Sequence, residues 1–310
     1  MNIAKDVTEL VGNTPLVKIN HLADDLQAEV VAKVESFNPA SSVKDRVALA
    51  MVNAAEASGK LKPGGTLVES TSGNTGVALA MVGAARGYKV VITMPESMSK
   101  ERRALMRAFG AELVLTPAAE GMKGTVEAAK KVVAEREGAI LASQFTNPAN
   151  PQAHFETTAE EIWADTDGKV DVFVAGIGTG GTVTGVGRRL KELNPDIEVF
   201  GIEPAESALL TTGEAGAHGI QGIGANFVPE ILDSTVMTKV LTVKTADAIA
   251  MAREAAAKEG LLVGISAGSA LVGALRLAQR PDMKGKRIVA LLPDTGERYL
   301  STPLFKDLMD

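Results

Sequence analysis

The residue best suited to chemistry in this 310-residue sequence is Lys44, which stands at the start of a strongly helical run. Its surroundings, Pro-Ala-Ser-Ser-Val-Lys-Asp-Arg over residues 39–46, predict an amine that water reaches only in part. Loss of water disfavours the ammonium form, which frees the amine to attack an aldehyde and hold it as a Schiff base. The plainer interpretation is an ordinary helix start, with Ser41 or Ser42 as N-cap and Asp45 near the positive end of the helix dipole.

A glycine-rich loop follows the buried-strand pattern of residues 170–175 and reads Gly178-Thr179-Gly180-Gly181-Thr182. Glycines let the backbone approach a phosphate closely, and the helix expected after the loop offers N–H groups at its start. The spacing is not the G-x-G-x-x-G pattern of dinucleotide sites, and a single phosphate suits so short a loop better. For the loop alone, an ordinary tight turn between strand and helix is the alternative.

A second polar loop lies between a predicted strand at residues 66–70 and a predicted helix at residues 76–86, and it reads Thr71-Ser72-Gly73-Asn74-Thr75. Hydroxyls and N–H groups at a helix start suit the α-carboxylate of an amino acid. Asn74 both donates and accepts, so it could bond a ring hydroxyl of a cofactor. Thr71, Ser72 and Asn74 are also common helix-capping residues, which is the alternative for this loop.

Ser266 opens the last long helix, within the sequence Gly264-Ile265-Ser266. A neutral hydroxyl facing a pyridine nitrogen gives a weaker electron sink than an aspartate would. A weaker sink suits chemistry in which electrons released at the substrate Cα leave at once through Cβ, as in β-elimination. Taken alone, Ser266 would be interpreted as an N-cap. Together with Lys44 and the two loops it completes the parts of a pyridoxal phosphate site.

These segments, in this order, resemble the cysteine synthase family of O-acetylserine sulfhydrylases, and most closely its sulfide-using A type. The resemblance extends over nearly the whole chain and includes residues 10–16, 94–99, 144–148 and 221–225. It implies a two-domain, pyridoxal-phosphate-dependent enzyme with the tryptophan-synthase β-like fold (fold type II).

The cofactor-binding residues implied by the resemblance come from four segments of the chain. Lys44 is expected to form the Schiff base and to be the catalytic residue. The loop at residues 178–182 is expected to hold the phosphate, Ser266 to bond the pyridine nitrogen, and Asn74 to contact the cofactor as well. No metal is implied.

The implied substrate-binding residues are Gln144, Gly222 and the whole loop at residues 71–75. Two departures from the family pattern lie beside matched segments: Asn226 stands where a second glycine is usual, and Ala267 where a second serine is common. Either could alter substrate preference or lid motion. Neither removes a residue with an expected chemical role.

The implied reaction is β-replacement, in which O-acetyl-L-serine and sulfide give L-cysteine and acetate through an aminoacrylate. This makes the chain a transferase of the cysteine synthase, or O-acetylserine (thiol)-lyase, type. The alternatives are an enzyme using thiosulfate or O-phosphoserine and a cystathionine β-synthase; the absence of an appended regulatory domain or haem-ligand segment favours the sulfide-using enzyme. The carboxylate loop could also accept the C-terminal tail of serine acetyltransferase, as a role added to catalysis.

Short β-branched runs alternate with helical runs rich in alanine, leucine and glutamate, such as residues 126–137 and 245–259. This alternation predicts an α/β fold of mostly parallel sheets flanked by helices. The predicted strands lie at residues 30–34, 66–69, 89–93, 112–115, 170–175, 198–202 and 287–292. Both polar loops follow such strands, where open α/β folds bind ligands.

The resemblance also implies a division into two domains. Residues 45–150 are expected to form a smaller, mobile domain that carries the substrate-carboxylate loop. Residues 1–44 and 151–310 are expected to form the larger domain, with the phosphate loop and the pyridine-nitrogen serine. The stretch at residues 146–151, rich in proline and asparagine, is the expected crossing between the two.

Composition narrows the class of protein further. Hydrophobic residues make up 45% and charged residues 23% of the chain, a balance typical of a soluble globular protein with a large core. The net charge of −6 argues against nucleic acid as a partner. The basic cluster at residues 100–107 is interpreted as the solvated face of a helix. There is no cysteine, the three histidines are expected at the surface or in loops without metal-ligand spacing, and residues 1–6 show no signal pattern. We expect a cytoplasmic protein with no membrane partner, and the family resemblance implies a homodimer.

Overall fold

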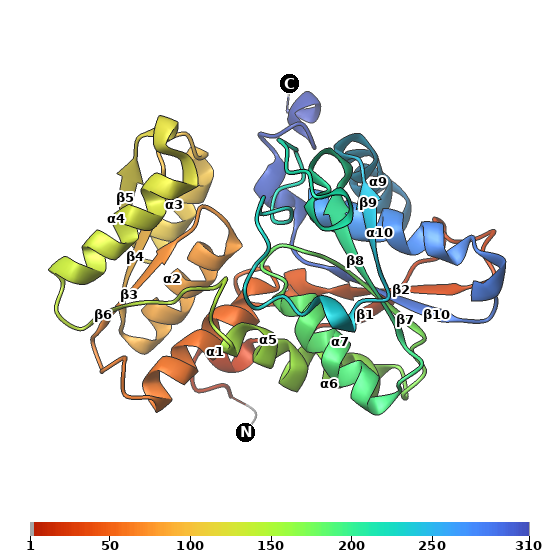
Figure 1. The fold of residues 1–310 in the computed structure, drawn as a ribbon, viewed down its shortest axis with the longest axis horizontal. Helices are drawn as coiled ribbons and strands as arrows, with labels where there is room; N and C mark the ends of the chain where they lie inside the picture. The colour runs from red at the N-terminus through yellow and green to blue at the C-terminus, as the bar shows by residue number, and fades with distance from the viewer. Residues whose placement is uncertain (1–2, 310) are drawn as a thin grey trace. The chain divides into compact units, whose positions relative to one another are not determined.

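The computed structural model describes residues 3–309 and divides into two compact units (Figure 1). The larger consists of Gly12–Phe37 and Pro151–Asp310, and the smaller of Asn38–Asn150 with the N-terminal segment to Val11. From the sequence, all of residues 1–44 were expected to belong to the larger domain, whereas residues up to Val11 and from Asn38 onward belong to the smaller unit. Val7 and Val11 pack against the core of the smaller unit, which accounts for the difference at the N-terminus. The expectation of no signal pattern includes residues 1–2, which lie outside the described residues.

A six-stranded sheet forms the centre of the larger unit, in the order β1-β2-β10-β7-β8-β9. Every neighbouring pair is parallel except β1 and β2, which are antiparallel. The strands are β1 (Leu16–Lys18), β2 (Glu29–Val34), β7 (Val172–Gly176), β8 (Glu198–Pro204), β9 (Lys239–Val243) and β10 (Arg287–Leu292). The helices are α6 (Ala159–Asp165), α7 (Gly181–Leu193), α8 (Leu209–Thr212), α9 (Thr245–Glu259) and α10 (Ile265–Ala278), while α5 (Ala149–Ala153) spans the boundary between the units.

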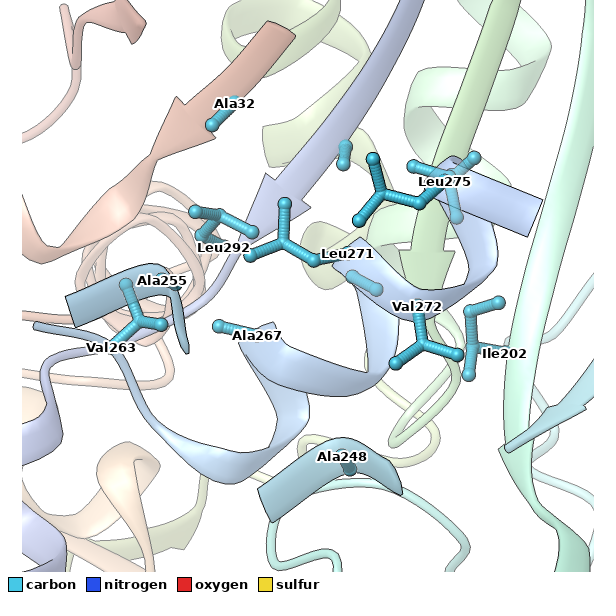
Figure 2. Packing of buried hydrophobic residues seen from close by; sticks show 14 of the residues in the cluster. Ala32, Ile202, Ala248, Ala255, Val263, Ala267, Leu271, Val272, Leu275 and Leu292 are labelled. Carbon is cyan, nitrogen blue, oxygen red and sulfur yellow. The ribbon is translucent and has the colours of Figure 1, made fainter. Parts of the chain in front are cut away.

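Helix α10 is the central helix of this unit, and every residue of it except Arg276 is buried. Figure 2 shows Leu271 of α10 beside Leu292 of β10, and Val272 beside Ile202 of β8. Ala248 and Ala255 of α9 belong to the same core cluster. Burying such a side chain contributes about 1.5–3 kcal/mol. The first turn of α10, which carries Ser266, is therefore fixed by packing on several sides.

A four-stranded parallel sheet, in the order β5-β4-β3-β6, forms the centre of the smaller unit. Its strands are β3 (Thr66–Ser70), β4 (Lys89–Pro95), β5 (Glu112–Thr116) and β6 (Ala139–Leu141), and its helices are α1 (Lys44–Ala57), α2 (Asn74–Arg86), α3 (Lys100–Ala108) and α4 (Gly121–Glu135). Leu67 of β3 packs in one core with α1 and α2, whereas Val68 packs on the opposite face with α4. Side chains of β3 therefore alternate between two covered faces.

The predicted α/β class is confirmed, and all seven predicted strands are present. Three further strands were not predicted: β1, β6 and β9. β1 and β6 have only three residues each, too few for a pattern to emerge. Both polar loops follow the carboxyl ends of parallel strands, β3 and β7, as expected. Between residues 3 and 309, no helix has the length and apolar character required to cross a membrane.

Candidate functional site

Lys44 is the first residue of α1 and is half-buried, in agreement with the expectation of partial solvation. Its N–H donates to Ser42 Oγ at 3.3 Å, and the buried carboxylate of Asp45 accepts the N–H of Ala40 at 2.5 Å. Neither Ser41 nor Ser42 is the N-cap residue, so that alternative is wrong in detail. The contacts of Ser42 and Asp45 fix the backbone from which Lys44 projects.

The loop at residues 71–75 directly joins β3 to α2. The N-cap of α2 is Gly73, which has no side chain, and Asn74 is the first helical residue. Hence no side chain of this loop acts as the N-cap, and the capping alternative is wrong for Ser72 and Asn74. Thr71 is not the N-cap either, but its Oγ1 accepts the N–H of the N-cap residue Gly73 at 3.2 Å. The loop is held from α3 by Arg102, whose guanidinium donates to the Ser72 carbonyl at 3.1 Å. Arg102 thus has a role that the interpretation of residues 100–107 as a solvated face missed.

Gln144 lies beside this loop although it is distant in sequence. Thr75 Oγ1 donates to Gln144 Oε1 at 2.6 Å, and both side chains are buried. The structure therefore brings together the two parts of the expected carboxylate site that belong to the smaller unit.

Glu69, the residue that sequence reasoning missed here, lies behind this pair. Its carboxylate accepts the N–H of Ser143 at 2.7 Å and bonds both the main-chain N–H and the side-chain amide of Gln144. Ser143 has φ +58°, so this tight turn is held in a conformation that non-glycine residues seldom adopt. A carboxylate at the end of an apolar strand, just before a polar loop, was the available signal in the sequence.

Burial raises the pKa of the Glu69 carboxyl from its usual 4.5 to about 7. The hydrogen bonds from Ser143 and Gln144 act in the opposite direction, because they favour the ionised form. Among the described residues, no charged side chain adds to this shift. Glu69 therefore changes charge near neutral pH.

The glycine-rich loop joins β7 to α7 in the larger unit. Gly180, the N-cap of α7, has φ +82°, a conformation that favours glycine. A Cβ atom at Gly178 would overlap the carbonyl oxygen of Gly222, and one at Gly180 would crowd Leu232. The loop is thus a cradle of bare backbone at a helix N-terminus, which fits a phosphate group.

Ser266 lies close to the same cradle. Gly264 is the N-cap of α10, so the interpretation of Ser266 as an N-cap is wrong. Ser266 is 4% exposed, and its Oγ lies 3.8 Å from the position that a Cβ would take at Gly222. Gly178, Gly222 and Ser266, which were expected to share one site, are therefore neighbours within the larger unit.

His154 is completely buried, and the expectation of a surface or loop histidine is wrong for it. It begins a π-helical segment, His154–Thr158. Its Nδ1 lies 2.9 Å from Thr158 Oγ1, and its Nε2 lies 3.2 Å from the Oγ1 of Thr182 in the glycine loop. His154 thus supports Thr182 of the glycine-rich loop, a relationship that sequence spacing alone did not show.

The two departures from the family pattern have structural explanations. Asn226 has φ +63°, which asparagine tolerates better than most residues after glycine. Its side-chain oxygen accepts a hydrogen bond from Ser207 Oγ at 2.6 Å. Ala267 is fully buried in the core cluster, where a methyl group requires no polar partner.

The residues present fit pyridoxal phosphate. Within the larger unit, the bare backbone of residues 178–182 at the N-terminus of α7 fits the phosphate, and Ser266 offers a hydroxyl near the same loop. Within the smaller unit, Lys44 offers an amine and Asn74 an amide. No group of three or more histidine, cysteine, aspartate or glutamate side chains in the described chain is arranged to hold a metal ion.

The chain is similar to known pyridoxal-phosphate dependent enzymes over nearly its whole length. The family described as "Pyridoxal-phosphate dependent enzyme" matches residues 7–294. A cysteine synthase of Staphylococcus aureus (strain Mu50 / ATCC 700699) is 50% identical over 301 residues, which is 97% of this chain and 96% of the relative.

Two solved structures show the same fold over almost the full length. The crystal structure of a cysteine synthase (OASS) from Entamoeba histolytica has a TM-score of 0.95 and 45% identity, covering 98% of this chain and 91% of that one. The crystal structure of an O-ureido-L-serine synthase has a TM-score of 0.95 and 49% identity, covering 99% of this chain and 96% of that one.

Proposed function

Because the chain belongs to the family of pyridoxal-phosphate dependent enzymes, we propose that it converts O-acetyl-L-serine and sulfide to L-cysteine and acetate. The observation that carries this proposal is the serine, not an acid, at position 266 beside a phosphate cradle, in a chain half identical to a cysteine synthase. The neutral hydroxyl favours elimination and replacement at Cβ over reactions that need a fully delocalised carbanion.

The cofactor would be held covalently by the Lys44 amine. Its phosphate would lie on residues 178–182, its ring hydroxyl against Asn74 and its pyridine nitrogen against Ser266. When bound, pyridoxal phosphate supplies the electron sink that acidifies the substrate Cα–H and allows a group to leave from Cβ.

The substrate carboxylate would bind at the start of α2. The unpaired N–H groups of a helix N-terminus and nearby hydroxyls favour a negative charge, and the loop at residues 71–75 offers both. Gln144, hydrogen-bonded to Thr75, borders this loop. Gly222 would leave room for the substrate side chain beside Ser266.

Once the substrate amine replaces it in the covalent link, the Lys44 amine would be free to transfer the proton at Cα. The lysine amine removes that proton, the bond between Cβ and the acetate oxygen breaks, and the electron pair leaves on acetate. The sulfur of HS⁻ then forms a bond to Cβ, and Lys44 returns the proton to Cα. One substrate and one HS⁻ thus give one cysteine and one acetate.

A different nucleophile or leaving group is the second candidate. The 49% identity to an O-ureido-L-serine synthase shows that the same fold occurs in an enzyme named for another β-substituted product. Thiosulfate or O-phosphoserine use, or cystathionine β-synthase activity, is the corresponding alternative for this chain.

We also propose a mobile smaller domain, formed by residues 45–150, that closes on the bound carboxylate and excludes water. We propose further that the protein is a cytoplasmic homodimer. We also propose that the loop at residues 71–75 binds the C-terminal tail of a serine acetyltransferase. Light scattering tests the dimer, and a peptide of that tail should inhibit competitively against O-acetyl-L-serine.

Product analysis tests the main proposal. The holoenzyme is incubated with O-acetyl-L-serine and sulfide, and in parallel with thiosulfate, with O-phospho-L-serine and sulfide, and with L-serine and homocysteine. We expect cysteine to form fastest in the first mixture. Cysteine formation only from O-phospho-L-serine, or cystathionine as the main product, would overturn the assignment of substrates while leaving the family unchanged.

A further inference from the structure

Three buried side chains form a relay behind the proposed carboxylate loop. Glu69, Gln144 and Thr75 are 4%, 5% and 2% exposed. The Gln144 side chain hydrogen-bonds the Glu69 carboxylate on one side and accepts the Thr75 hydroxyl, at 2.6 Å, on the other. All three residues belong to the smaller unit.

The direction of these hydrogen bonds is fixed while Glu69 is ionised. A carboxylate only accepts, so the amide nitrogen of Gln144 must face Glu69. The amide oxygen then faces Thr75, whose single hydroxyl proton is donated to it. In this state the Thr75 hydroxyl offers only lone pairs to any other group. A substrate carboxylate also only accepts, so this hydroxyl cannot bond it.

Protonation of Glu69 allows this direction to reverse. One oxygen of the acid still accepts the main-chain N–H groups of Ser143 and Gln144, while the acid O–H donates to the Gln144 amide oxygen. The Gln144 amide nitrogen then faces Thr75 and donates to it. The Thr75 proton is released and becomes available to a carboxylate bound at the start of α2.

We propose that Glu69 is a positioning residue: through Gln144 it determines whether the Thr75 hydroxyl offers a proton or only lone pairs to the substrate carboxylate. The inference rests on the proposed function, because it assumes that the loop at residues 71–75 binds that carboxylate. It adds that substrate is bound more tightly when Glu69 is neutral.

The charged groups on the elements that pack near Glu69 do not set its protonation state. The two strands beside β3 carry one charged residue, Lys89, which pairs with Thr66 at the other end of β3. Helix α2 carries only Arg86, in its last turn, and the charged residues of α4 are exposed. The first turn of α1 carries the charged side chains of Lys44, Asp45 and Arg46. Within the described chain none of these adds to the raised pKa of Glu69, which comes from burial.

Glu69→Gln tests the proposal, because glutamine keeps the shape but is neutral at every pH. Its oxygen can accept the Ser143 N–H and its nitrogen can donate to Gln144, which imitates the protonated acid. The KM for O-acetyl-L-serine and the Kd of L-serine, followed by the visible absorption of the holoenzyme, are measured between about pH 6 and 8.5, across the pKa of Glu69. Dividing the wild-type value by the variant value at each pH removes the titration of the substrate amine.

We expect the wild-type to variant ratio of both constants to rise about tenfold as pH increases through this range, which corresponds to one hydrogen bond to a charged group. The ratio of kcat values should change less, because the lost contact is made in substrate binding. A ratio of Kd values that is independent of pH would overturn the proposal.

Thr75→Val and Thr75→Ser form a matched pair that keeps the test open if Glu69→Gln fails to fold. The valine variant lacks the hydroxyl and should lose this part of the pH dependence, whereas the serine variant should keep it. Equal pH dependence in both would contradict the proposal. A wild-type protein that does not turn over O-acetyl-L-serine contradicts the proposed function instead, and the Kd for L-serine still tests the relay.

Discussion

Gly178 packs so closely against Gly222 that a Cβ atom at residue 178 would overlap the Gly222 carbonyl oxygen. This contact joins the glycine-rich loop after β7 to the segment beside Ser266. The shape of this loop therefore depends on the absence of a side chain at residue 178.

Gly178→Ala should weaken cofactor binding by at least about tenfold, because a backbone atom must move to accommodate the added methyl group. The measurement is a titration of apo-protein with pyridoxal phosphate, followed by visible absorption. Gly187→Ala, in α7, is the control, since its Cβ would meet only side-chain atoms of Val236 and Val199. Normal cofactor affinity in Gly178→Ala would contradict the cradle.

His154→Gln should also reduce cofactor affinity, because Thr182 loses the ring nitrogen that lies 3.2 Å from its hydroxyl. A double-mutant cycle with Thr182→Val separates this effect from general destabilisation. We expect a coupling free energy of about 0.5–3 kcal/mol, typical of residues in one hydrogen-bond network. Additive effects on the pyridoxal phosphate Kd would show that His154 acts only on the fold.

The raised pKa of Glu69 predicts a pH dependence of stability. In the folded protein the Glu69 carboxyl has a pKa of about 7, above its usual 4.5, so it binds a proton more tightly than in the unfolded chain. Protonation of Glu69 therefore favours folding. This stability is fully present below about pH 4.5 and is lost as pH rises to about 7. The lost amount is about 3 kcal/mol, from roughly 1.36 kcal/mol per pKa unit.

Urea unfolding of wild type and Glu69→Gln at about pH 5 and pH 8, on either side of the Glu69 pKa, measures this contribution. The free energy of unfolding of the wild type, relative to the variant, should be lower at the higher pH. The variant itself is the control for every other titrating group. A constant difference between the two proteins would show that Glu69 is ionised at both pH values.

Asn226→Ala should destabilise the protein by about 2 kcal/mol. Alanine is strained in the left-handed conformation of residue 226, and Ser207 loses its acceptor. Asn226→Gly is the matched control, because glycine adopts this conformation freely and loses only the hydrogen bond. Thermal unfolding compares them, and equal melting temperatures for the two variants would contradict the backbone explanation.

Much of this architecture was predictable because the strands are short apolar runs with clear boundaries. β10 and α9 match their predicted ranges, and both polar loops lie at strand ends as expected. Motif residues such as Lys44 and Ser266 could be proposed from sequence because their expected chemistry depends on residue type and local order.

The supporting residues could not be found in the same way. Glu69 reaches Gln144 across 75 positions of sequence, and His154 reaches Thr182 across 28. Such contacts depend on how strands and helices pack, which local patterns do not encode. The burial of His154 also depends on a π-helical turn, a rare feature with no composition signal.

The most direct test of the central claim is the visible absorption and turnover of Lys44→Ala, with Lys44→Arg as a control that keeps the positive charge. If Lys44 holds pyridoxal phosphate and moves the Cα proton, both variants should lose the cofactor band of the purified protein. Both should also lose cysteine formation from O-acetyl-L-serine and sulfide by at least about 10²–10⁴-fold. Turnover of wild-type magnitude in Lys44→Ala would contradict the account.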